Sequence, residues 1–234
     1  VQGVFRWRNA VGLARYVAPM HALRWPVVLF DLDGTVLDTV ELIRASHEHA
    51  LREVLGEAPS DEEIMAGIGT PLMEQMEKFS PERAEELFHT YRRWNHANTA
   101  RLIRRYDGME ELLVELENEG ARLGIVTSKM KDAVDLAWDA LPSPIVWDVI
   151  ITTEDTPVHK PHPAPVLKAL ERLDATPADA VYIGDSPFDL QSANAAGCAA
   201  IGVTWGVFNR ETLAAENPLA VVDSPAELLE VLAG

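Results

Sequence analysis

The sequence has few of the features that mark secreted, membrane or nucleic-acid-binding proteins. It holds one cysteine among 234 residues, Cys198, which excludes an internal disulfide and suits a reducing compartment. No apolar stretch is long enough to span a membrane. Basic residues are scarce, because 20 Lys and Arg stand against 37 Asp and Glu, for a net charge of −17. This balance argues against nucleic acid or an anionic membrane as a partner, and we expect a cytoplasmic protein.

The first 24 residues lack the continuous apolar segment of a secretory signal, and they precede the first predicted strand. We expect them to form a weakly ordered extension without a catalytic role. An amphipathic helix and a true start at Met20 are the alternatives.

The most informative segment that is present spans residues 27–39. Four apolar residues, 27–30, lead directly into Asp31 and Asp33. Such a run is typical of a strand buried on both faces of a parallel sheet. Two carboxylates at its end, without a nearby Lys or Arg in the sequence, are costly to bury unless a cation binds there. We therefore predict a metal-dependent site at the carboxyl edge of an open α/β sheet.

Beyond residue 105 the pattern alternates between helix and strand. We expect helices at 109–119, 131–140, 163–173, 190–196 and 224–232, and strands at 122–126, 146–152, 180–184, 199–203 and 219–222. This alternation predicts an α/β fold with a doubly wound parallel sheet.

Residues 41–104 differ from the rest, because they show helical periodicity without a strand pattern. We expect an all-helical cap inserted after the first strand and placed over the carboxyl edge of the sheet. The core would then consist of residues 25–40 and 105–234.

Three further groups of polar residues belong to this predicted edge. Thr127 and Ser128 follow the strand at 122–126, and Asp185 follows the strand at 180–184 after Gly184. Lys160 precedes Pro161, Pro163 and Pro165, which exclude helix before residue 163 and stiffen the loop that presents the ammonium group.

Together these segments resemble the haloacid dehalogenase superfamily, most of whose members are phosphatases. Residues 31–36, Asp-Leu-Asp-Gly-Thr-Val, are similar to its first motif, and Thr127, residues 160–165 and residues 184–189 to the next three, in the family's order. Within the superfamily, residues 38–43 and 68–72 resemble the phosphoglycolate phosphatase branch. Residues 91–96 bring the chain closest to its bacterial pyrophosphatase subgroup.

The resemblance implies a phosphatase mechanism. Asp31 would be the nucleophile that becomes an aspartyl phosphate, and Asp33 would act as general acid and base. Mg²⁺ would be held by the Asp31 and Asp185 carboxylates and the Asp33 backbone carbonyl, because hard oxygen ligands favour this ion.

The resemblance also implies how a small phosphorylated substrate is bound. Thr127, Ser128 and Lys160 would contact the phosphoryl group, with Asp189 orienting Lys160. The loop at 67–72 would meet the substrate from the cap, although a plain turn between helices is the alternative.

Several alternatives accompany this hypothesis. A hydrolase acting on phosphoglycolate, pyrophosphate or a similar compound is favoured over a phosphomutase of related fold. A phospho-accepting receiver domain needs about half this length and no helical insert, and a phosphonatase would need a motif around Lys78. A metal site at His159 and His162 is disfavoured, because no neighbouring Cys or His has the spacing of a metal site. We expect the protein to be a monomer or a homodimer.

Overall fold

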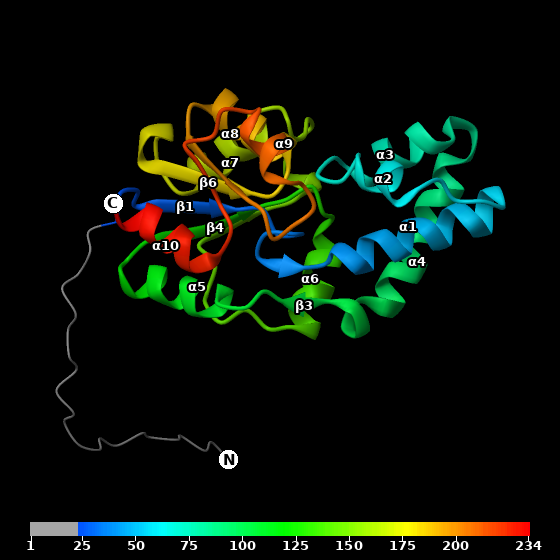
Figure 1. Ribbon diagram of the computed structural model, residues 1–234, viewed down its shortest axis with the longest axis horizontal. Helices are drawn as coiled ribbons and strands as arrows, with labels where there is room; N and C mark the ends of the chain where they lie inside the picture. Colours follow the sequence, from blue (N-terminus) through cyan, green and yellow to red (C-terminus); the bar gives the residue numbers. More distant parts are fainter. Residues whose placement is uncertain (1–22) are drawn as a thin grey trace, which may run out of the picture.

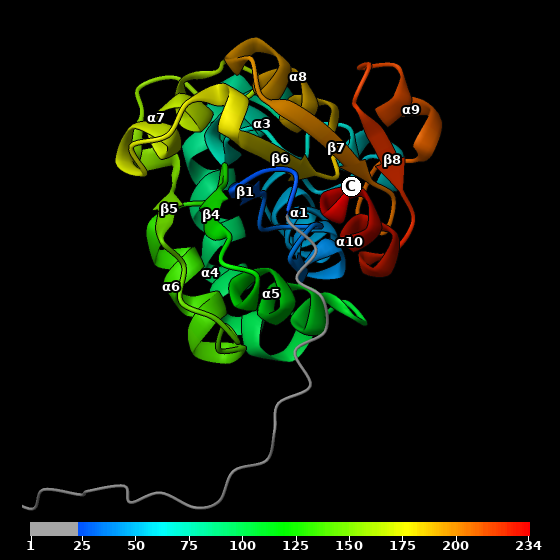
Figure 2. The same cartoon turned by 90° about the vertical axis from the view of Figure 1, so that its left-hand side faces the viewer.

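A computed structural model describes residues 23–234, and its centre is a six-stranded, all-parallel sheet with the strand order β5-β4-β1-β6-β7-β8 (Figures 1 and 2). The strands are β1 (Val27–Phe30), β4 (Arg122–Val126), β5 (Val149–Ile151), β6 (Ala180–Gly184), β7 (Ala199–Val203) and β8 (Ala220–Val222). Val27 of β1 pairs with Arg122 of β4 on one side and with Ala180 of β6 on the other. The predicted doubly wound sheet is therefore confirmed, with β1 in its middle.

Helices cover both faces of this sheet (Figure 2). One face carries α5 (Met109–Asn118), α6 (Lys131–Ala140) and α10 (Pro225–Ala233), and the other carries α7 (Ala164–Arg172), α8 (Pro187–Ala196) and α9 (Arg210–Ala214). Val28 and Phe30 belong to the first hydrophobic cluster, whereas Val27 and Leu29 belong to the second. Successive side chains of a strand point to opposite faces, so both faces of β1 must be apolar.

The insert is helical and has a hydrophobic core of its own. It contains α1 (Val40–Leu55), α2 (Asp61–Met65), α3 (Leu72–Phe79), the short 3-10 helix η1 (Pro81–Arg83) and α4 (Ala84–Leu102), and it lies to one side of the sheet in Figure 1. Its buried cluster is separate from the two clusters of the sheet and comprises Ala50, Leu51, Val54, Ile64, Met76, Ala84, Leu87 and Tyr91. The predicted all-helical cap after the first strand is confirmed.

A two-stranded antiparallel ribbon joins the cap to the sheet. It pairs β2 (Leu37–Asp38), where the chain enters the cap, with β3 (Arg104–Arg105), where the chain leaves it. The sequence pattern did not predict these strands, because two residues are too few to show an alternation. The ribbon holds the two segments that connect the cap and the sheet side by side, so the cap is attached to the core through two adjacent segments only.

Some predicted boundaries were wrong for local reasons. The strand expected at 146–152 is limited to 149–151, since the chain before it is a loop in which the Val146 side chain is 84% exposed. Helix α8 begins at Pro187 rather than at 190, because Pro187 takes the first helical position and Ser186 caps it. The short helix α9 and the 3-10 helices η2 (Thr153–Asp155) and η3 (Pro177–Asp179) were not predicted.

The predicted N-terminal extension lies outside the described residues except for its last two. Leu23 packs against the core, and the Arg24 amide donates to the Leu232 carbonyl of α10 at 2.9 Å. Within residues 23–234, no helix combines the length and the apolar character that crossing a membrane requires.

Candidate active site

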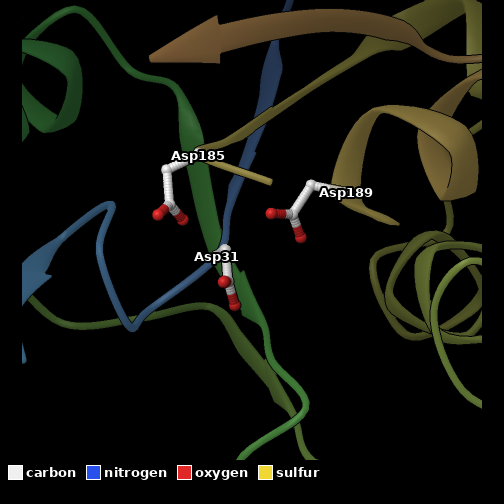
Figure 3. Close-up of side chains that lie close together, drawn as sticks. All are labelled: Asp31, Asp185 and Asp189. Carbon is white, nitrogen blue, oxygen red and sulfur yellow. The ribbon is translucent and has the colours of Figure 1, made fainter. Parts of the chain in front are cut away.

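Three acidic side chains meet at the carboxyl edge of the sheet (Figure 3). Asp31 follows β1, Asp185 follows the neighbouring strand β6, and Asp189 lies in the first turn of α8. One oxygen of each lies within 4.8 Å of the other two, and all three side chains are buried. The strand order brings them together, because β1 and β6 are adjacent although their sequence positions are far apart.

Asp189 has both of its oxygens committed to protein groups. Its Oδ1 accepts from Lys160 Nζ at 2.5 Å and lies 3.1 Å from the Tyr182 hydroxyl. Its Oδ2 accepts from the backbone N–H and the hydroxyl of Ser186, at 3.0 and 2.7 Å. Asp189 is therefore placed to hold Lys160 rather than a metal ion.

One carboxylate oxygen of Asp31 is buried and has few partners within the protein. Lys160 Nζ forms an ion pair with Asp31 Oδ1 at 3.0 Å, and apart from Lys160 this oxygen has no hydrogen-bond partner among the described residues. Burial raises the pKa of Asp31 to about 7; Lys160 opposes this, whereas the charges of Asp189 and Asp33 add to it. Burial lowers the pKa of Lys160, but the carboxylates of Asp189 and Asp31 outweigh burial and raise it.

Asp185 also lies among more negative than positive charges. Its Oδ1 accepts from the Thr35 hydroxyl at 3.2 Å and its Oδ2 from the Val207 N–H at 2.7 Å. Burial, followed by the charges of Asp189 and Asp31, raises the pKa of Asp185 well above its ordinary value. A Cβ at Gly34 would collide with its carboxylate, so the backbone encloses it closely.

The donor set fits a hard divalent cation. Two buried carboxylates, Asp31 and Asp185, lack enough positive charge around them, and one Asp31 oxygen has no partner among the described residues apart from Lys160. Carboxylate and carbonyl oxygens are the ligands that Mg²⁺ prefers. The predicted third ligand is the backbone carbonyl of Asp33, which lies two residues after Asp31 in the chain. The Asp33 side chain is not part of the acidic cluster, whose third member is Asp189.

The Asp33 side chain is paired with Lys129, a residue that the sequence pattern did not assign to the site. Lys129 Nζ lies 2.9 and 3.0 Å from the two Asp33 carboxylate oxygens, and both side chains are largely buried. The only signal was the position of Lys129 directly after Thr127 and Ser128 at the end of β4. The pairing joins residues 96 positions apart, so no local pattern indicated it.

A cavity of about 80 Å³ lies between the acidic edge and the cap. Since a water molecule needs about 10–15 Å³ of such space, only a small ligand fits. The core contributes Asp31, Asp33, Thr127, Ser128 and Asp185 to its lining. Lys160 is not among the lining residues, and it contacts the Asp31 side chain from within the protein instead.

The cap loop at 67–72 also lines the cavity and touches the core. The Ser128 hydroxyl donates to the Gly69 carbonyl at 2.7 Å, and Gly69 has a φ of 103°. A Cβ at Gly69 would lie 2.7 Å from the Ser186 hydroxyl oxygen. Only glycine suits both the conformation and the close approach.

Comparison with known proteins identifies the family. The model of the haloacid dehalogenase-like hydrolases matches residues 28–203. The pyrophosphatase PpaX of Anoxybacillus flavithermus is 35% identical over 205 residues, which cover 88% of this chain and 95% of that protein. The chain therefore belongs to the haloacid dehalogenase-like hydrolase family, and it is an enzyme.

Solved structures agree with this assignment. A haloacid dehalogenase-like hydrolase from Streptococcus pneumoniae superposes with a TM-score of 0.78 at 26% identity, covering 87% of this chain and 96% of that one. A protein from Haemophilus somnus 129pt, described as a predicted phosphoglycolate phosphatase, gives 0.79 at 25% identity, with 89% and 98% covered. The resemblance found in the sequence is confirmed.

Proposed function

We propose that this enzyme is a Mg²⁺-dependent phosphatase that hydrolyses a small phosphate ester or anhydride, phosphoglycolate or pyrophosphate, through an aspartyl phosphate. The names of its relatives support this substrate class. One observation carries the proposal: the buried Asp31 carboxylate lines the cavity beside Asp185, with the Lys160 ammonium group 3.0 Å from its Oδ1. A carboxylate that lines the cavity is placed to attack the phosphorus of a bound substrate, as a nucleophile must.

The residues divide the reaction between them. Asp31 attacks phosphorus and forms the acyl phosphate while the leaving oxygen takes a proton from Asp33. Asp33 then takes a proton from the water that attacks the phosphorus of the aspartyl phosphate, which releases phosphate and restores Asp31. Lys129 holds the Asp33 carboxylate in place, and Lys160, held by Asp189, keeps positive charge beside Asp31.

Asp31, Asp185 and the Asp33 carbonyl would hold the Mg²⁺ ion, which would supply neutralising charge for phosphoryl transfer. Residues 41–104 would act as a cap domain over the core at 25–40 and 105–234, excluding water from the cavity. The single buried thiol of Cys198 suits a cytoplasmic enzyme, which we propose to act as a monomer or a homodimer.

Release of inorganic phosphate from phosphoglycolate, pyrophosphate and simple monoesters, measured with Mg²⁺ and with EDTA, tests this proposal. We expect turnover that needs Mg²⁺ and that falls to background in Asp31→Asn, with thermal unfolding retained. Asp135→Asn on the exposed side of α6 is the matched control and should turn over normally. Turnover in EDTA, or near-normal turnover by Asp31→Asn, would contradict the mechanism.

A further inference from the structure

The cap contributes basic side chains to one wall of the cavity. Arg92 and His96 lie one turn apart on α4, and both line the cavity. Lys129 lines it from the core. A chain with a net charge of −17 thus gathers Arg92, His96 and Lys129, in addition to the buried His47, around one small space.

Arg92 is held in place but keeps donors free. Its Nη2 pairs with the Asp132 carboxylate on α6, and its guanidinium lies over the Phe88 ring, 5.5 Å from the ring centroid. Within residues 23–234, no other side-chain nitrogen of Arg92 makes a hydrogen bond to protein. Because a guanidinium carries five N–H donors, the others remain free to bind a ligand.

His96 lies within the field of both neighbouring cations. Burial comes first among the causes that lower the pKa of His96, and the charges of Arg92 and Lys129 lower it further, against the opposing charge of Asp132. These three bases therefore act on a common region of the cavity. A His96 ring that is neutral at pH 7 can still donate one N–H to an anion.

The rest of the α4 wall is polar but uncharged, and it is fixed by contacts within the cap. Asn95 Nδ2 donates to the Ser46 hydroxyl on α1 at 3.0 Å, and the Tyr91 ring packs edge-on against His47 with centroids 4.7 Å apart. The positive charge of this wall thus comes from Arg92.

The phosphoryl group under attack has a source of positive charge in Lys160, beside Asp31, and an ion held by Asp31 and Asp185 would add to it. Arg92 and His96 lie on the cap, on the other side of the cavity from Asp31, and would face the leaving group of the substrate. We propose that Arg92 and His96, beside Lys129, bind a second anionic group on the substrate, a phosphate or a carboxylate carried by the leaving group. This inference rests on the proposed phosphatase function and names its substrate class.

Discrimination between matched substrates tests the inference. The readout is the ratio of kcat/KM for phosphoglycolate to kcat/KM for 2-hydroxyethyl phosphate, in which a hydroxymethyl group replaces the carboxylate. Pyrophosphate is measured against the same reference. We expect Arg92→Gln to lower one or both ratios by about tenfold or more, since a hydrogen bond to a charged group is lost. The compound with the larger loss identifies whether carboxylate or phosphate is the preferred second group.

Two variants separate the inference from a merely structural role. Arg93→Gln is the matched control, because Arg93 is 65% exposed, pairs with Glu53 and does not line the cavity; its ratios should equal those of the wild type. Asp132→Asn breaks the same link between α4 and α6 but keeps the guanidinium, so it should retain the ratios within about twofold. Equal losses in Asp132→Asn and Arg92→Gln, or unchanged ratios in Arg92→Gln, would overturn the inference.

The same data test the proposed function separately. If the enzyme releases phosphate from 2-hydroxyethyl phosphate, but the kcat/KM ratios of Arg92→Gln equal those of the wild type, only the second subsite is overturned. Release from none of the three compounds by the wild type would overturn the phosphatase proposal and this inference with it.

Discussion

Asp31, Asp185 and Asp189 share a buried space with one buried cation, Lys160. Asp189 satisfies Lys160 directly, whereas Asp31 and Asp185 have raised pKa values because burial and mutual repulsion disfavour their ionised forms. Such a cluster adds little to stability by itself, since desolvation offsets the attraction within each pair. Its charge excess is a property that suits a metal-binding site.

Removing the central cation should destabilise the fold. Lys160→Met leaves the Asp31 and Asp189 carboxylates buried without a counter-charge, so we expect the free energy of unfolding to fall by about 3–5 kcal/mol in EDTA. The loss should grow as the pH rises, because the carboxylates ionise. Urea unfolding at pH 5 and pH 8 measures both effects.

Lys168→Met is the matched control for this substitution. Lys168 pairs with Glu171 on the exposed side of α7, so its replacement should change stability little at either pH. If Lys160→Met unfolded at the same urea concentration as the control, the buried ammonium would not hold the cluster together.

The sequence pattern predicted those site residues that follow strands. A polar residue at the end of an apolar run lies at the carboxyl edge, so Asp31, Thr127 and Asp185 could be placed in one region before the structure was known. Lys129 and Arg92 could not be assigned to the site in this way. Their partners, Asp33 and Asp132, are remote in the sequence, and the pair of Arg92 with Asp132 forms only when the cap meets the core.

At the scale of elements, α1 carries a buried histidine whose surroundings are mostly apolar or aromatic. The His47 ring lies against Tyr91 and Phe79, and its nitrogens face the Ile43 carbonyl and Gln75 Oε1, each at 2.9 Å. Burial lowers the pKa of His47 below 6.5, while these two hydrogen bonds oppose the change. Gln75 in turn donates to the Thr70 carbonyl at 2.7 Å, so the histidine supports the loop that lines the cavity.

This histidine should make the stability of the protein fall in mild acid. Below about pH 6.5 the unfolded chain binds a proton at this histidine that the folded chain resists, so the unfolded state gains relative stability as the pH falls. Urea unfolding between pH 7.5 and pH 5.5 should therefore show a shallower fall in His47→Gln than in the wild type. His49→Gln, at a partly exposed position on the same helix, is the control. Parallel profiles for His47→Gln and the wild type would count against this account.

Long periodic elements were predictable, and short ones were not. The alternation beyond residue 105 placed the main strands and helices because each buries a complete apolar face. The ribbon of β2 and β3 and the five-residue helix α9 contain too few residues for a period. Helix α8 began earlier than expected because the Ser186 cap, formed with Asp189, stabilises a first turn that includes Pro187.

At the scale of the whole molecule, the cap and the core meet closely at Gly69. The loop carrying it accepts a hydrogen bond from Ser128 and passes close to Ser186. The ribbon of β2 and β3 is the covalent attachment, so this loop contact and the pair of Arg92 with Asp132 fix how the cap sits over the cavity.

Gly69→Ala should therefore impair activity more than stability. The added Cβ meets the Ser186 hydroxyl and favours a different φ, so the cap closes less completely and kcat/KM should fall by about tenfold or more. Gly67→Ala is the matched control: its Cβ would meet only the Gln75 side chain, at 3.5 Å, and its effect should be much smaller. Equal losses of kcat/KM in the two variants would contradict a special role for the contact at Gly69.

A covalent phosphoenzyme tests the central claim most directly. The enzyme is mixed with Mg²⁺ and phosphoglycolate or pyrophosphate, quenched in acid within milliseconds and digested for mass spectrometry. We predict one phosphoryl group on Asp31. In Asp33→Asn it should form more slowly, because the leaving oxygen loses its acid, and persist longer once formed, because the attacking water loses its base. Phosphate release without a phosphorylated peptide in either protein, or a phosphoryl group on another residue, would contradict the account.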